Sequence, residues 1–176
     1  MKKIISILVA SFALQLSGCA TTTNSSQSGV TRSQFLLMPA SQVDQMSAKA
    51  YAQTLTEAKQ KSTLNLDKAM YNRVNTISQR LIAQVGVFRP DAKDWAWEVN
   101  VEKNDQLNAY CMPGGKIMVF SGLVEKIKAT DDELAAVIGH EIAHALREHG
   151  RERMSQAYVQ QFGLRVLAAF VGNGVE

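Results

Sequence analysis

The sequence predicts an α+β domain in which a small antiparallel sheet lies beside one central helix and several flanking helices. Residues 95–102 alternate apolar and polar side chains, which is the period of a strand. Residues 107–112 and 116–120 flank Pro113-Gly114-Gly115, a turn signal that predicts a hairpin. The run from 134 to 146 is mostly apolar and carries a His-Glu-x-x-His motif, which predicts the central helix.

The first 18 residues have the features of a lipoprotein signal peptide. A basic start, Met1-Lys2-Lys3, precedes an apolar stretch over residues 4–16 that is too short to span a membrane as a stable helix. Leu16-Ser17-Gly18-Cys19 resembles a bacterial lipobox, which implies cleavage before Cys19 and lipid attachment to it. The alternative is an ordinary secretory signal with an incidental cysteine.

Residues 19–34 are rich in Ser, Thr and Gln, and this composition predicts a flexible tether between the anchor and a domain over residues 35–176. Ala20 follows the cysteine in place of Asp, and by resemblance to lipoprotein sorting this favours the outer membrane, with the domain facing the periplasm. Multiple acyl chains would hold the protein stably at that membrane. Cys111 would then have no disulfide partner.

The domain is predicted to begin with two helices. Residues 35–38 form a short apolar run, either a strand or a plug on the core, and Pro39 ends it. We expect a helix after Ser41, with Asp44 as a variant capping partner, continuing to about Lys59. A second helix should start at Asp67 and end near Gly86, because apolar residues recur in it at helical spacing.

The central helix has a clear start signal. A short helix is expected over residues 121–127, and Thr130 with Glu133 then forms a Thr-x-x-Glu capping box. The helix should run to about His149, with Gly150 as its terminator, and a further helix should follow from about Glu152.

The His-Glu-x-x-His motif predicts a zinc site of one ion per chain. His140 and His144 are four residues apart, so a helix places both imidazoles on one face, where they can bind one metal ion. Glu141 can act as general base towards a water beside that metal, as in zinc metalloproteases. The alternative is an accidental match on an exposed helix, in which Glu141 is merely solvated.

Composition is that of an ordinary globular domain, with 46% hydrophobic and 20% charged residues in a chain of 176. The formal charge is +3, but Lys2 and Lys3 belong to the segment that we expect to be removed. The remaining basic residues nearly balance the 16 acidic ones, so we predict no nucleic-acid partner.

Three linked segments resemble the HtpX-like and CAAX-prenyl-protease-like zinc endopeptidases, peptidase family M48, and within it the small bacterial periplasmic lipoproteins. They are Asn-Ala-Tyr-Cys-Met-Pro-Gly-Gly-Lys-Ile (108–117), Phe-Ser-Gly-Leu (120–123) and Glu-Leu-Ala-Ala-Val-Ile-Gly-His-Glu-Ile-Ala-His (133–144). The resemblance implies a zincin-like fold of the gluzincin type and hydrolysis of peptide bonds. It implies misfolded envelope proteins as substrates, and so a role in protein quality control.

The resemblance also implies that Asn108, Ala109 and Tyr110 form an edge strand beside the zinc and bind the substrate backbone. An edge strand supports this interpretation because it offers free N–H and C=O groups to an extended peptide. The alternative is that Asn108 only closes a turn.

The chain departs from the family at the third zinc ligand, a glutamate in a downstream Glu-x-x-x-Asp pattern that is absent here. Glu148 should lie about 12 Å along the same helix from His140, too far to complete the site. Glu152 would need a sharp bend, and His149 is expected at the surface or behind the ligands. We therefore expect a domain that is incomplete at its C-terminus. The alternative function is a catalytically inactive lipoprotein that acts as a binding or structural domain.

Overall fold

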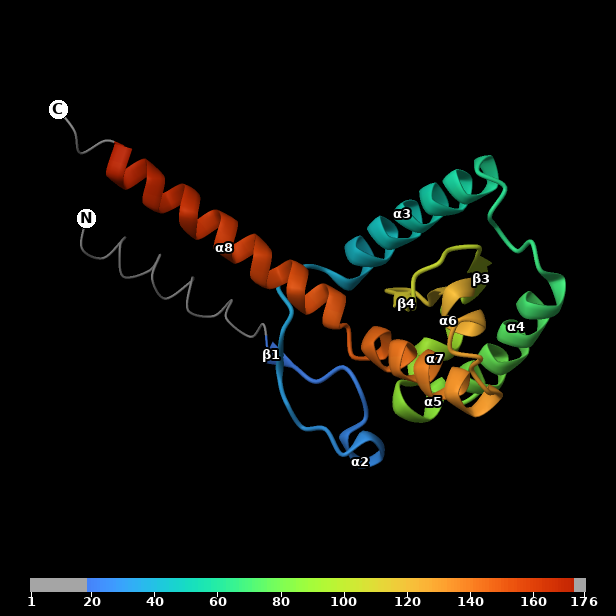
Figure 1. Ribbon diagram of the computed structural model, residues 1–176. Helices are drawn as coiled ribbons and strands as arrows, with labels where there is room; N and C mark the ends of the chain where they lie inside the picture. Colours follow the sequence, from blue (N-terminus) through green and yellow to red (C-terminus); the bar gives the residue numbers. More distant parts are fainter. Residues whose placement is uncertain (1–18, 173–176) are drawn as a thin grey trace, which may run out of the picture.

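The computed structural model describes the backbone of residues 19–172 and the side chains of residues 20–165. A small sheet has α3 (Ala40–Gln60) on one face, and α4 (Lys68–Ile82) and α7 (Asp131–Leu146) on the other (Figure 1). The predicted signal peptide, residues 1–18, lies outside the described residues, as does the side chain of Cys19. Within the described part, no helix is both long enough and apolar enough to cross a membrane.

The sheet is mixed, so the prediction of an antiparallel sheet was wrong. Its strands are β3 (Glu98–Glu102), β4 (Ala109–Met112) and β5 (Lys116–Phe120), in the order β3-β5-β4. The predicted hairpin is present, since β4 and β5 pair antiparallel, but β3 pairs parallel with β5. The reason is the loop over residues 103–108, which carries the chain past the place of β5 to the far edge of the sheet. The hairpin then returns β5 to the centre, in the direction of β3.

The two faces of β5 bury different cores, as the two-residue period of a strand requires. Ile117 and Val119 belong to the larger core, together with side chains from α4 and α7. Met118 and Phe120 face α3 and form a smaller core with Tyr51. The Tyr51 hydroxyl donates a 2.5 Å hydrogen bond to the Ile117 carbonyl, which ties α3 to the central strand.

The two N-terminal helices begin in different ways. α4 starts directly after Asp67, in agreement with the predicted start, and the Asp67 side chain caps it by accepting a 2.9 Å hydrogen bond from the Met70 N–H. Helix α3 begins at Ala40, and the predicted cap by Ser41 is wrong, because Pro39 already holds the extended conformation that precedes the helix. α4 ends at Ile82, before the predicted Gly86; α5 (Val85–Phe88) and a 3-10 helix, η1 (Pro90–Asp94), complete the connection to β3.

The segment predicted to be a tether contains a few short elements. β1 (Cys19–Ala20) pairs antiparallel with β2 (Gln34–Phe35), and α2 (Ser25–Ser28) lies between them. Gln34 is only 1% exposed. The tether over residues 19–34 remains a prediction, to which the structure adds that its last residue is held against the domain.

The C-terminal part of the described chain extends away from the sheet. After α6 (Ser121–Glu125) and α7, helix α8 (His149–Gly172) projects from the body of the domain (Figure 1). Its base lies against β2, and it follows α7 after a break of two residues. This break determines how the histidines of α7 and α8 are placed relative to one another.

A glycine at the start of α6 fixes the loop that gives the sheet its order. The Gly122 N–H donates to the Asn104 carbonyl at 2.8 Å, and a Cβ atom at Gly122 would lie 2.6 Å from the backbone of Asp105. Gly122→Ala should therefore lower the free energy of unfolding by about 1–3 kcal/mol, through overpacking. Urea denaturation followed by circular dichroism measures this change.

Gly163→Ala is the matched control, because a Cβ atom there meets nothing within 4 Å. In α8 this substitution should leave stability unchanged or raise it by up to about 1 kcal/mol. If Gly122→Ala and Gly163→Ala changed the free energy of unfolding equally, the proposed steric conflict between a Cβ atom at Gly122 and the backbone of Asp105 would be refuted.

Candidate metal centre

The start of α7 is set by its capping box, as predicted. The Thr130 hydroxyl accepts a hydrogen bond from the Glu133 N–H at 3.3 Å, and the Glu133 carboxylate accepts one from the Thr130 N–H at 2.8 Å. Asp131 and Asp132 complete an acidic first turn, which favours the positive end of the helix dipole. The histidines lie three and four turns further along the helix.

His140 and His144 approach each other through the nitrogen atoms that a metal would use. Their Nε2 atoms are 3.0 Å apart, and the ring planes are at 85°. Two nitrogens bound to one tetrahedral zinc ion at 2.0–2.1 Å lie about 3.3 Å apart. The pair therefore fits a zinc ion after a small rotation of the rings. His140 is exposed and His144 is half-buried, so burial is not what forces the two rings together.

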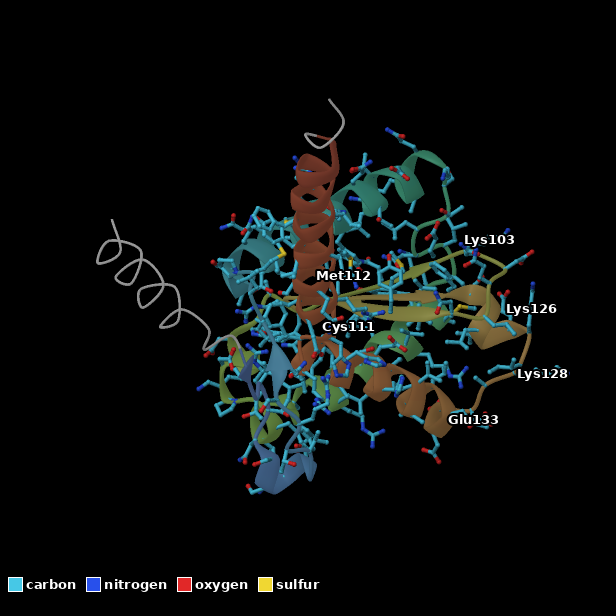
Figure 2. All side chains as sticks on the ribbon, turned by 90° about the vertical axis from the view of Figure 1, so that its left-hand side faces the viewer. Lys103, Cys111, Met112, Lys126, Lys128 and Glu133 are labelled. Carbon is cyan, nitrogen blue, oxygen red and sulfur yellow. The ribbon has the colours of Figure 1, made fainter. Side chains whose placement is uncertain are left out.

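Glu141 follows His140 on α7, the helix that packs against β4. It is half-buried, and its charge contributes, after burial, to raising the pKa of the Cys111 thiol on β4. Figure 2 shows Cys111 and Met112 near the end of α7 that joins α8, whereas Glu133 lies at the other end of α7.

β4 is an edge strand of the described sheet, since only β5 pairs with it. Of the three residues predicted to bind substrate, Asn108 is exposed and Ala109 is buried in the larger core. The Tyr110 side chain lies on the opposite face, against α3, with its ring edge-to-face on Phe120 at 6.1 Å. Tyr110 can therefore contact a peptide beside α7 only through its backbone.

Helix α7 ends earlier than predicted, and two non-helical residues separate it from α8. α7 ends at Leu146, Glu148 has a φ angle of +49°, and α8 begins at His149. The expected terminator, Gly150, instead lies inside α8. A left-handed conformation at a residue other than glycine costs about 1–3 kcal/mol, so contacts around Glu148 must offset it.

Those contacts are ion pairs that two arginines form with the buried Glu148 carboxylate. Glu148 is 7% exposed and pairs with Arg89 at 2.9 Å and with Arg151 at 2.6 Å. Arg89 also donates to the Leu146 carbonyl at 3.0 Å and stacks over Trp95. Glu148 is therefore not a metal ligand here, but the reason differs from the predicted one: it lies beyond the end of α7, with its carboxylate bound elsewhere.

The carboxylate of Glu152 is also hydrogen-bonded to other side chains. Its two oxygens accept hydrogen bonds from Arg32, each at 2.7 Å, and Gln34 donates to it at 3.2 Å. The hydrogen bond from Arg32 is the main cause that lowers the pKa of Glu152 to about 2. Glu152 does border an open pocket beside His144, because the break between α7 and α8 supplies the sharp bend that this position requires. Its carboxylate nevertheless serves to attach Arg32 and Gln34 to α8.

His149 lies behind His144, which is one of the two positions expected for it. Its Nδ1 atom lies 2.5 Å from Nδ1 of His144, and burial followed by the charges of His144 and Arg147 lowers its pKa. The prediction of a position at the surface or behind the ligands named no contact. Among the described residues, no three His, Cys, Asp or Glu side chains form a group that could hold a metal ion.

The ion cluster at the break yields a direct test. Glu148→Gln keeps the size of the side chain but removes the charge between two guanidinium groups. We expect the free energy of unfolding to fall by about 3–5 kcal/mol, as when one partner of a buried pair is lost. Thermal and urea denaturation measure this loss.

Asp131→Asn provides the comparison, because Asp131 pairs with Arg73 while its own side chain is 69% exposed. That exposed pair should contribute about 1 kcal/mol or less. A Glu148→Gln variant that is no less stable than Asp131→Asn would contradict a structural role for the cluster.

Comparison with known proteins points to one family. The profile described as Peptidase family M48 matches residues 68–175. The mitochondrial metalloendopeptidase OMA1 of Arabidopsis thaliana is 46% identical over 61 residues, which cover 35% of this chain and 12% of that protein. The OMA1 metalloendopeptidase of Bos taurus is 30% identical over 132 residues, covering 74% of this chain and 24% of the relative.

A bacterial protease matches as well. The beta-barrel assembly-enhancing protease of Yersinia pestis is 29% identical over 90 residues, covering 51% of this chain and 17% of that protein. The matched stretch therefore spans no more than about a quarter of the length of these relatives.

Proposed function

Because the chain belongs to peptidase family M48, we propose that it carries the metal-binding helix and the substrate strand of a zinc-dependent endopeptidase. The observation that supports this most is the convergence of the His140 and His144 Nε2 atoms on one side of α7, beside Glu141. The corresponding fold is zincin-like, of the gluzincin type, with α7 as its active-site helix.

A zinc ion held by His140 and His144 would supply a Lewis acid that polarises the scissile carbonyl and lowers the pKa of water. Glu141 acts as general base and then as general acid. It takes a proton from the attacking water and passes it to the nitrogen of the leaving amine. Glu141 is half-buried on α7, and its charge acts on Cys111 of β4, so the carboxylate is near the strand proposed to bind the peptide.

The free edge of β4 binds the substrate as an added strand. Of the proposed residues Asn108, Ala109 and Tyr110, Asn108 already accepts a hydrogen bond from the Phe120 N–H of β5 at 3.1 Å through its carbonyl, so the backbone groups that face the free edge are those of Ala109 between its two neighbours. The side chains of Ala109 and Tyr110 are turned into the two cores. Recognition through the backbone accepts many sequences but requires an extended chain. Unfolded or damaged envelope proteins fit this requirement, so we assign the protein to quality control.

The same proposal places the protein at the bacterial outer membrane, facing the periplasm. The lipobox-like sequence before Cys19 would provide a lipid anchor after removal of residues 1–18, and residues 19–34 would link it to the domain. The name of the Yersinia pestis relative, which refers to beta-barrel assembly, agrees with an envelope location.

The role of Glu141 is tested by Glu141→Gln in the purified full chain supplied with zinc. Cleavage of an unfolded protein such as denatured casein should fall by about 10²–10⁴-fold, the usual contribution of a general base. Zinc content should stay that of the wild type, because Glu141 is not one of the two proposed ligands.

Glu125→Gln, at the exposed end of α6, is the matched control and should cleave at the wild-type rate. Cleavage retained in Glu141→Gln would rule out this assignment of the base. A wild-type chain that binds zinc but cleaves nothing would support the alternative of a binding domain.

A further inference from the structure

The break after α7 brings a third imidazole against a proposed zinc ligand. We propose that His149 is a positioning residue, which accepts a hydrogen bond from Nδ1 of His144 and so fixes the tautomer and orientation in which His144 binds the metal. The two Nδ1 atoms are 2.5 Å apart, and the ring centroids are 4.8 Å apart. This inference rests on the proposed zinc site of His140 and His144.

Metal binding through Nε2 of His144 determines which nitrogen of this ring carries the proton. Its Nε2 faces Nε2 of His140 at 3.0 Å, so Nε2 is the nitrogen that binds the metal. A neutral imidazole that gives its Nε2 lone pair to a metal carries its proton on Nδ1, and that N–H needs an acceptor. Nδ1 of His149 is the acceptor in reach, so His149 presents a lone pair there and carries its own proton on Nε2.

This contact depends on the break in the chain. Had α7 continued, His149 would lie about 140° around the helix from His144 and about 7.5 Å along it. Side chains so placed do not touch. The left-handed backbone at Glu148 turns the chain, so that the first residue of α8 returns to the face that carries His144.

Three interactions hold the turn in place. Arg89 and Arg151 bind the Glu148 carboxylate from two sides. Gln34 donates a 2.5 Å hydrogen bond to the Arg147 carbonyl, which has no partner within α7. The break is thus fixed from β2, from the connection after α5 and from α8 itself.

His149 does not act as a further ligand in this arrangement. It contacts Nδ1 of His144, whereas His140 contacts Nε2, on the other side of the ring. One ion bound between the two Nε2 atoms is therefore separated from His149 by the His144 ring. The residue supports the ligand without contacting the metal.

The first test measures zinc affinity of the full chain by competition with a chelator. His149→Phe keeps an aromatic ring but offers no acceptor, and it should weaken zinc binding about 10–100-fold. His149→Asn should recover most of this loss, because its Oδ1 is bonded to Cγ, as Nδ1 is in histidine. Gln160→Ala, an exposed change on the same helix, should bind zinc as the wild type does.

The second test needs no variant. Nitrogen-15 NMR of the zinc-loaded wild type should show the His144 proton on Nδ1 and the His149 proton on Nε2. The opposite tautomer on either residue would overturn the inference, as would wild-type zinc affinity in folded His149→Phe or an equal loss in the Phe and Asn variants. Failure of the wild type to bind zinc would instead refute the proposed function together with this inference.

Discussion

The arrangement of the site depends on one buried ionic cluster, in which the carboxylate of Glu148 lies between the guanidinium groups of Arg89 and Arg151. This cluster stabilises a backbone conformation that is unfavourable for glutamate, and that conformation ends α7 and begins α8. Arg89 comes from the connection between α5 and η1, so the cluster also attaches the first half of the domain to α7. The arrangement of the three histidines therefore depends on charged residues that do not contact them.

Elements with a strong local signal were predictable from the sequence. The Thr130–Glu133 capping box, the Asp67 cap and the hairpin around Gly114 and Gly115 all formed where the residue types required. The parallel pairing of β3 with β5 was not predictable, because it depends on where a six-residue loop crosses the sheet. A two-residue period gives the faces of a strand but not its direction in the sheet.

The site shows the same division between local and distant causes. Spacing alone placed His140 and His144 on one face of α7, with Glu141 beside them. It gave His149 a position at the surface or behind the ligands but no contact, because helical periodicity continues past Leu146 and Gly150 was the only visible stop signal. The actual stop is set by Arg89, which lies 59 positions before Glu148 in the chain, and no local pattern reveals that pairing.

The central claim is that His140 and His144 together bind one zinc ion, and zinc stoichiometry of the purified protein tests it most directly. We predict one zinc per chain in the wild type, with loss of that zinc in both His140→Ala and His144→Ala and with secondary structure retained in each. A wild-type protein without zinc, or a zinc ion that remains after both histidines are replaced, would contradict the account.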